Sequence, residues 1–149
     1  DIVVTTNSGF PLDMNLYQAV KGMSAAARIV KNRGAIIAAA ECSDGVPTHG
    51  NFRDLLLQGK SPEEWLHIIY GAKEPIPDQW QVQILAKILQ QAEVYLFSAL
   101  PEPEVRLAQL KPISDIASCV RQLLEARQAS HGTRVAVLPE GPQTVPYLV

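Results

Sequence analysis

The chain has 149 residues and a mass of 16.3 kDa, with 47% hydrophobic and 19% charged residues, which suits one globular domain with a buried core. Its formal net charge of −2 argues against nucleic-acid binding, because phosphate contacts need a clustered basic face. No apolar run reaches the length of a membrane span, no signal peptide is visible, and the two cysteines have no CxxC context, so we expect a cytoplasmic protein without membrane contact.

The first predicted element is a short β-branched run, residues 2–5, typical of a buried strand in a parallel sheet. Turn-forming residues 7–11 follow, and Asp13 is placed to cap a helix that starts near Met14. We expect this helix to end at the basic, glycine-terminated stretch 32–34. The side that should pack on the sheet carries Leu16, Val20, Met23, Ala27 and Val30.

The opposite side of this helix carries few charges. It holds Gln18, Lys21 and small residues such as Gly22 and Ala25, with Tyr17 on the flank, which indicates that something approaches closely. The spacing lets Tyr17, Gln18 and Lys21 point toward one spot, and a cation beside an amide and a phenol suits a small carboxylate. From spacing alone, a structural interpretation is favoured, with the lysine solvated and the tyrosine packed beside the core.

The remaining elements alternate between strands and helices, which predicts an α/β fold with right-handed crossovers. We expect a mostly parallel four-stranded sheet flanked by helices. The chain begins directly in strand-like sequence without an initiator methionine, so we expect a single domain cut from a larger two-domain protein. Further strands are expected at 35–40, 93–98 and 133–138; helices at 52–57, 61–71 (N-cap Ser61), 79–91 and 114–129; and one short helix within 100–112.

The opening stretch DIVVTTNSGFPLDMNLYQAVKGMSAAARIV resembles the start of the C-terminal domain of the nickel-dependent lactate racemase family. The similarity is closest through PLD-NLYQAVKGM and continues in looser form through GAIIAAAECSDG, the Gln79-Trp80 helix and the final LPEGPQTVPYL. It implies that residues 1–149 are such a domain, partnered across an interdomain cleft by an N-terminal domain outside this chain. Enzymes of this family are racemases (isomerases) that interconvert 2-hydroxy acid enantiomers by hydride transfer, using a nickel pincer nucleotide.

The same resemblance implies site residues. Gln18 and Lys21 would bind the carboxylate of a small 2-hydroxy acid, Tyr17 would help close the pocket, and Trp80 would line it. Trp65 is a competing tryptophan, and a tryptophan near a helix start is more often part of the core than a substrate wall.

The turn Asn7-Ser8-Gly9 lies at the carboxyl end of the first strand, where ligands of open α/β sheets collect. These residues are candidates to contact the cofactor or the substrate. Their role as turn formers is at least as good an interpretation. Asp44-Gly45 resembles a recurring Asp-Gly of the family, and it is also a common turn.

Three histidines, His49, His67 and His131, show no metal-ligand spacing, so we expect no metal site. The sequence contains no G-x-G-x-x-G, P-loop or nucleophile elbow, and Cys42 and Cys119 offer no support for a thiolate mechanism. In the family, the cofactor-attaching lysine, the nickel-coordinating histidine and the acid–base histidines belong to the N-terminal domain. The resemblance therefore implies that this chain has no catalytic residue of its own, holds no cofactor in isolation and is inactive alone.

Two other classes of function stay open from the sequence. The chain could be a non-catalytic α/β domain that binds a small carboxylate, with the pocket kept and the chemistry lost. It could also be a structural module of a multidomain protein, in which Tyr17, Gln18 and Lys21 have no ligand.

Overall fold

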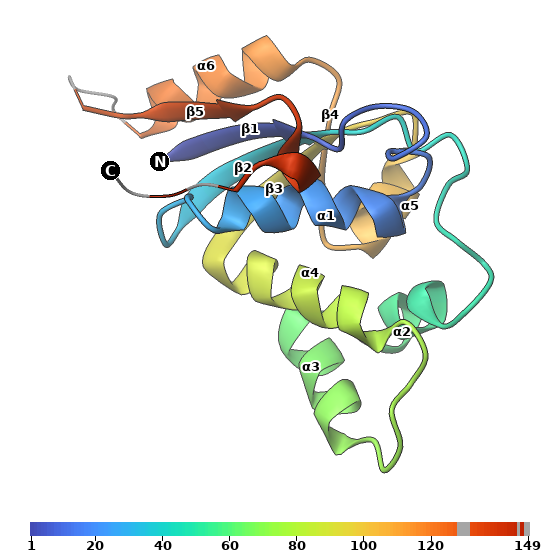
Figure 1. Cartoon of the computed structure of the whole chain (residues 1–149). Helices are drawn as coiled ribbons and strands as arrows, with labels where there is room; N and C mark the ends of the chain where they lie inside the picture. Colours follow the sequence, from blue (N-terminus) through green and yellow to red (C-terminus); the bar gives the residue numbers. More distant parts are fainter. Residues whose placement is uncertain (128–131, 146, 148–149) are drawn as a thin grey trace.

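The computed structural model describes residues 1–127, 132–145 and 147 (Figure 1). Its strands are β1 (Ile2–Thr6), β2 (Gly34–Ala39), β3 (Ala92–Phe97), β4 (Lys111–Ile113) and β5 (Val135–Leu138). Its helices are α1 (Leu16–Ala27), α2 (Phe52–Gln58), α3 (Pro62–Gly71), α4 (Gln79–Gln91), α5 (Glu102–Leu107), α6 (Ile116–Ala126) and the short 3₁₀ helix η1 (Gly141–Gln143). The predicted α/β fold is confirmed. Within the described ranges, no helix is both long and apolar enough to cross a bilayer.

The strands lie in the order β4-β3-β2-β1-β5, and every described pair is parallel. The chain steps from β1 to β4 in one direction and then returns past β1 to β5. Right-handed crossovers in opposite directions place their helices on opposite faces of a sheet. Accordingly, α1, α4 and α5 cover one face and α6 covers the other, while α2 and α3 lie beyond α4, away from the sheet (Figure 1).

The predicted number of strands was wrong, because the sheet has five strands and not four. The additional strand is β4, a three-residue edge strand with Pro112 at its centre, next to the short helix α5 that was expected in this segment. A proline is tolerated at a sheet edge, where its missing N–H leaves no ladder partner unsatisfied. A strand that is so short, half-exposed and interrupted by proline gives no alternating pattern to recognise in the sequence.

The start of α1 also differs from the prediction. Asn15, not Asp13, is the N-cap, and its Oδ1 accepts a hydrogen bond from the Gln18 backbone N at 3.0 Å. Asp13 is buried, and its Oδ2 accepts from the Glu41 backbone N at 3.1 Å, which joins the loop after β1 to the end of β2. Asp and Asn cap helices almost equally well, so a distant partner decided between them. The helix ends at Ala27, before the predicted end at 32–34.

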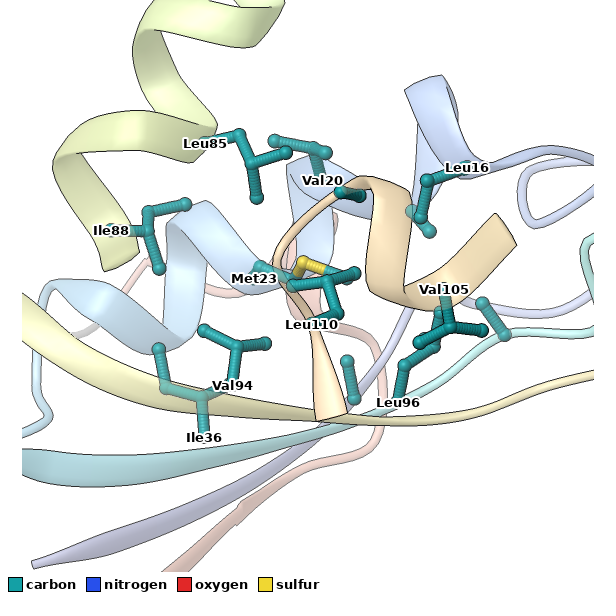
Figure 2. Packing of buried hydrophobic residues seen from close by; sticks show 14 of the residues in the cluster. Leu16, Val20, Met23, Ile36, Leu85, Ile88, Val94, Leu96, Val105 and Leu110 are labelled. Atoms are coloured by element: carbon teal, nitrogen blue, oxygen red, sulfur yellow. The ribbon is translucent and has the colours of Figure 1, made fainter. Parts of the chain in front are cut away.

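The core is divided by the sheet into two clusters. Figure 2 shows the larger one, in which Met23 of α1 lies between α4 and the sheet, close to Leu85, Ile88, Ile36 and Val94. Burial of each such side chain contributes about 1.5–3 kcal/mol. The smaller cluster lies under α6 and contains Ile2, Ala35, Ile37, Cys119 and Leu123. The predicted continuation of the last helix to 129 lies partly outside the described residues.

Candidate functional site

Ligands of open α/β sheets bind at the carboxyl ends of the strands, where the strand order reverses. In this sheet the reversal lies between β1 and β5, which continue into different loops. The two loops are joined directly, because Thr6 Oγ1 donates a hydrogen bond to the Pro139 carbonyl at 2.5 Å. The usual ligand crevice of this fold is therefore already crossed by the protein itself.

Helix η1 fills the space beside this crossing. A Cβ atom added at Gly141 would lie 2.7 Å from the Thr6 carbonyl oxygen and 3.0 Å from Gly22 Cα, so η1 rests directly on α1. A Cβ atom at Gly22 would lie 2.6 Å from the same Thr6 oxygen. The small residues on this side of α1 thus accommodate the chain's own η1 and β1 loop. The close approach predicted from the sequence is real at Gly22, but here it is made by protein and not by a ligand.

The turn after β1 is organised by Asn7, which is 2% exposed. Its Nδ2 donates to the Leu12 carbonyl and its Oδ1 accepts from the Gly22 backbone N at 2.9 Å. Ser8 and Gly9 both have left-handed backbone conformations, with φ of 66° and 72°. These contacts favour the role as turn formers. Gly9 also lines an open cavity of about 540 Å³ at the ends of β1, β2 and β3, and contact of Asn7, Ser8 or Gly9 with a cofactor stays a prediction.

Tyr17, in the first turn of α1, is held by two other helices. Its ring stands edge-on to Phe52 of α2, with centroids 5.4 Å apart and an interplanar angle of 78°. From α4, Trp80 Nε1 donates to the Tyr17 hydroxyl at 2.9 Å, and Gln81 Nε2 donates to the Tyr17 carbonyl at 2.7 Å. Residues 63 positions apart in the sequence are therefore brought together at the start of two helices.

The two tryptophans occupy opposite environments. Trp80 is 51% exposed, whereas Trp65 is fully buried and donates its Nε1–H to the Gly59 carbonyl at 3.0 Å. Trp80, and not Trp65, therefore presents an accessible ring beside Tyr17. Its contact with a substrate stays a prediction.

Gln18 and Lys21 follow Tyr17 on the accessible side of α1. Gln18 is half-buried and Lys21 is exposed. Within the part of the chain that the structure describes, Lys21 forms no ion pair and no side-chain hydrogen bond. Lys21 follows Gln18 at the i, i+3 spacing of one helix face. Its ammonium group and the Gln18 amide therefore provide donors that suit a small anion.

A cavity of about 190 Å³ opens beside the first turn of α1. Its lining combines residues of α1, the loop before α2 and the start of α4: Asn15, Tyr17, Gln18, Pro47, His49, Phe52 and Asp78. Lys21 lies one turn further along α1 and is not part of this lining.

Phe52, His49 and Asp78 belong to this lining, although they are not among the site residues predicted from the sequence. Asp78 accepts a hydrogen bond from the Asn51 backbone N at 3.2 Å, which ties the loop before α2 to the start of α4. Gly50 permits this contact, because a Cβ atom there would collide with the Asp78 carboxylate. The one feature of the sequence that could have pointed to Asp78 as a site residue is its position directly before the Gln79-Trp80 helix.

No group of three His, Cys, Asp or Glu side chains converges on a metal-sized site within residues 1–127, 132–145 and 147, and His131 lies outside these ranges. Burial raises the pKa of the Cys42 thiol to about 12, with a further contribution from the Asp13 carboxylate. Burial also raises the pKa of Cys119. Both thiols are therefore protonated at neutral pH and are poor nucleophiles.

The fold and the residues Tyr17, Gln18 and Lys21 define an α/β domain with a polar surface on its first helix, near the carboxyl edge of a parallel sheet. A family model described as the lactate racemase C-terminal domain matches residues 1–145, and the chain belongs to this family. The resemblance stated from the sequence is thereby confirmed.

Individual relatives agree with this assignment. The lactate racemases of Thermoanaerobacterium thermosaccharolyticum and Lactiplantibacillus plantarum are each 36% identical, over 144 and 145 residues respectively, which is 95% of this chain and 33% of each relative. The solved structure of the lactate racemase apoprotein from T. thermosaccharolyticum matches with a TM-score of 0.87 at 33% identity, over 97% of this chain and 35% of that chain. The chain thus spans about a third of the length of these relatives.

Proposed function

We propose that this chain is the C-terminal, substrate-contacting domain of a longer racemase that acts on 2-hydroxy acids of the lactate type. The observation that supports it most is the 2.9 Å hydrogen bond from Trp80 to Tyr17, which joins an accessible tryptophan of α4 to the helix that carries Gln18 and Lys21. The family resemblance implies site roles for Tyr17, Gln18, Lys21 and Trp80, and the hydrogen bond links two of these residues across helices that are far apart in the sequence. The activity belongs to the longer protein, so this chain alone should not racemise lactate.

In this proposal Lys21 and Gln18 bind the substrate carboxylate. The ammonium group supplies charge and the amide supplies a second donor, so the carboxylate is held by two points on successive turns of one helix. A 2-hydroxy acid is racemised only when its C2–H bond breaks and re-forms on the opposite face. A carboxylate held at its end leaves C2 able to present either face to the reacting groups. Tyr17 and Trp80 would exclude water from this side of the substrate.

Among the residues that the structure describes, no group of three metal-binding side chains converges on a site for the nickel pincer nucleotide that the family resemblance implies. We therefore assign the cofactor and the groups that move the hydroxyl proton to the rest of the longer enzyme, which would face this chain across an interdomain cleft. No step of the reaction is assigned to a residue of this chain. We also propose a cytoplasmic location, since Cys42 and Cys119 are both free buried thiols, as is common in a reducing compartment.

The test is chiral chromatography of D- and L-lactate after incubation with the full-length, cofactor-loaded protein. Conversion in both directions is expected. Absence of conversion in a preparation with confirmed nickel content would reject lactate as the substrate.

Lys21→Ala in the same full-length protein should lower kcat/KM about 10- to 100-fold, because a hydrogen bond to a charged group contributes about 1.5–3 kcal/mol. Thermal stability should stay unchanged, since Lys21 is exposed and unpaired within the described residues. Lys87→Ala provides the matched control, because Lys87 is also an exposed helical lysine but lies on α4. Parallel loss of activity and stability in Lys21→Ala would instead assign a structural role.

A further inference from the structure

The cavity beside Tyr17 and Gln18 has a volume of about 190 Å³, which is more than the methyl group of lactate would fill. A water molecule takes about 30 Å³ of liquid volume, so the cavity offers room for roughly six non-hydrogen atoms. One methyl group would leave most of this space empty. The size of the cavity therefore bears on which 2-hydroxy acid the enzyme takes.

The lining of the cavity has an apolar part, Tyr17, Pro47 and Phe52, and a polar part that includes His49 and Asp78. Phe52 is fully buried and packs edge-on against Tyr17, and Pro47 is buried beside them. Asp78 is fixed by its hydrogen bond from the Asn51 backbone N, and its carboxylate gives this end of the lining a negative charge. His49 is exposed at the same cavity, so its side chain can be changed without disturbing the core.

We propose that this cavity holds the C2 substituent of the substrate, and that the enzyme prefers 2-hydroxy acids with an uncharged aliphatic substituent larger than methyl, up to about six non-hydrogen atoms. The inference rests on the proposed function, in which Gln18 binds the substrate carboxylate. Gln18 is also part of the cavity lining, and C2 is bonded directly to the carboxylate carbon. A substituent on C2 therefore starts at the cavity mouth. Asp78 disfavours substituents that carry a second carboxylate.

The first experiment compares lactate, 2-hydroxybutanoate, 2-hydroxy-4-methylpentanoate and malate as substrates of the full-length, cofactor-loaded protein. Because each buried methylene favours binding about fourfold, kcat/KM should rise from lactate to 2-hydroxy-4-methylpentanoate by at least tenfold. Malate should be poorer than lactate. Equal kcat/KM for all three monocarboxylates, or a preference for lactate, would overturn the inference while leaving racemisation itself intact.

The second experiment narrows the cavity with His49→Trp. This variant should lower the ratio of kcat/KM for 2-hydroxy-4-methylpentanoate to kcat/KM for lactate at least tenfold, because a methyl group needs less of the reduced space than an isobutyl group does. His67→Trp is the control, since His67 is also an exposed histidine but lies on α3, outside the cavity. An equal loss of kcat/KM for all the acids in His49→Trp would overturn the assignment of the cavity to the C2 substituent.

Binding of the same acids, measured by calorimetry on both variants, separates the two proposals. Binding that tightens with substituent size and is lost in His49→Trp, in a protein that racemises none of the acids, would support the cavity assignment and reject the proposed reaction. Racemisation at a rate that does not depend on the substituent would support the proposed reaction and reject the cavity assignment. Absence of binding for every acid would reject both.

Discussion

Neighbouring parts of one face of helix α1 use similar sequence features for different purposes. At Gly22, the Thr6 carbonyl and Gly141 of η1 approach closely, so this part of the helix surface is covered by the chain itself. At Gln18 and Lys21 the same face stays accessible, beside a tyrosine that α2 and α4 hold in place. Small residues on a helix therefore indicate a close neighbour without identifying it. Polar residues without protein partners are the more specific sign of a ligand.

The packing of η1 and the β1 loop at Gly22 is best tested with Gly22→Ala, for which we expect the largest effect on stability. Alanine is a better helix former than glycine by about 1 kcal/mol, so an exposed position would gain stability. At Gly22 the added Cβ would lie 2.6 Å from the Thr6 carbonyl oxygen, and we expect a net loss of about 2 kcal/mol from overpacking. Chemical denaturation measures the difference, with Ser24→Ala on the same helix as the control. A gain in stability would mean that η1 and the β1 loop do not pack here.

The accessible part, where Trp80 of α4 meets Tyr17, is tested with Trp80→Phe, which removes the Nε1–H donor and keeps an aromatic ring. We expect kcat/KM of the full-length enzyme to fall about fivefold, since a typical hydrogen bond contributes about 1 kcal/mol, with little change in stability because Trp80 is 51% exposed. Tyr17→Phe should have a similar effect. The double variant should lose little more than either single one, because both changes break the same hydrogen bond. Fully additive losses would show that the two residues act independently.

The smallest expected effect is on stability, and it comes from an ion pair that holds α2 in place. Helix α2 carries Phe52, which packs against Tyr17. Arg53 of α2 pairs with Glu104 of α5 through two hydrogen bonds of 2.5 and 2.9 Å. This pairing lowers the pKa of Glu104 below its ordinary value of 4.5. A lowered carboxyl pKa in the folded state means that the stabilisation is present above pH 4.5 and is lost as the pH falls through the folded pKa.

Glu104→Gln should therefore cost about 0.5–1 kcal/mol at pH 7 and nothing at a pH below the folded pKa. Urea denaturation at several pH values measures this dependence. Glu102→Gln is the matched control, because Glu102 pairs with Arg106 on the exposed surface of the same helix, with both side chains more than half exposed. Equal and pH-independent losses in both variants would contradict the pairing.

Local signals in the sequence predicted the elements whose determinants lie within a few residues. Ser61 was predicted to cap α3, and its Oγ accepts from the Glu64 backbone N at 3.2 Å. The helix predicted at 79–91 is α4 (Gln79–Gln91), in which Val82 and Leu85 are fully buried. Tyr17 and Lys21 are predicted site residues because the family resemblance carries them, and the predicted fold was right except for β4.

By itself, therefore, the sequence determined the α/β alternation, the start of α3 at its Ser61 cap, and the family to which the chain belongs, since capping and periodicity depend on near neighbours. The tertiary structure alone decided that Asp13 bonds Glu41 and does not cap α1, that η1 covers Gly22, and that Phe52 and Asp78 meet at one cavity. Each of these contacts joins residues far apart in the chain. Their partners are chosen by the packing of helices on the sheet, and no local pattern of residues records that choice.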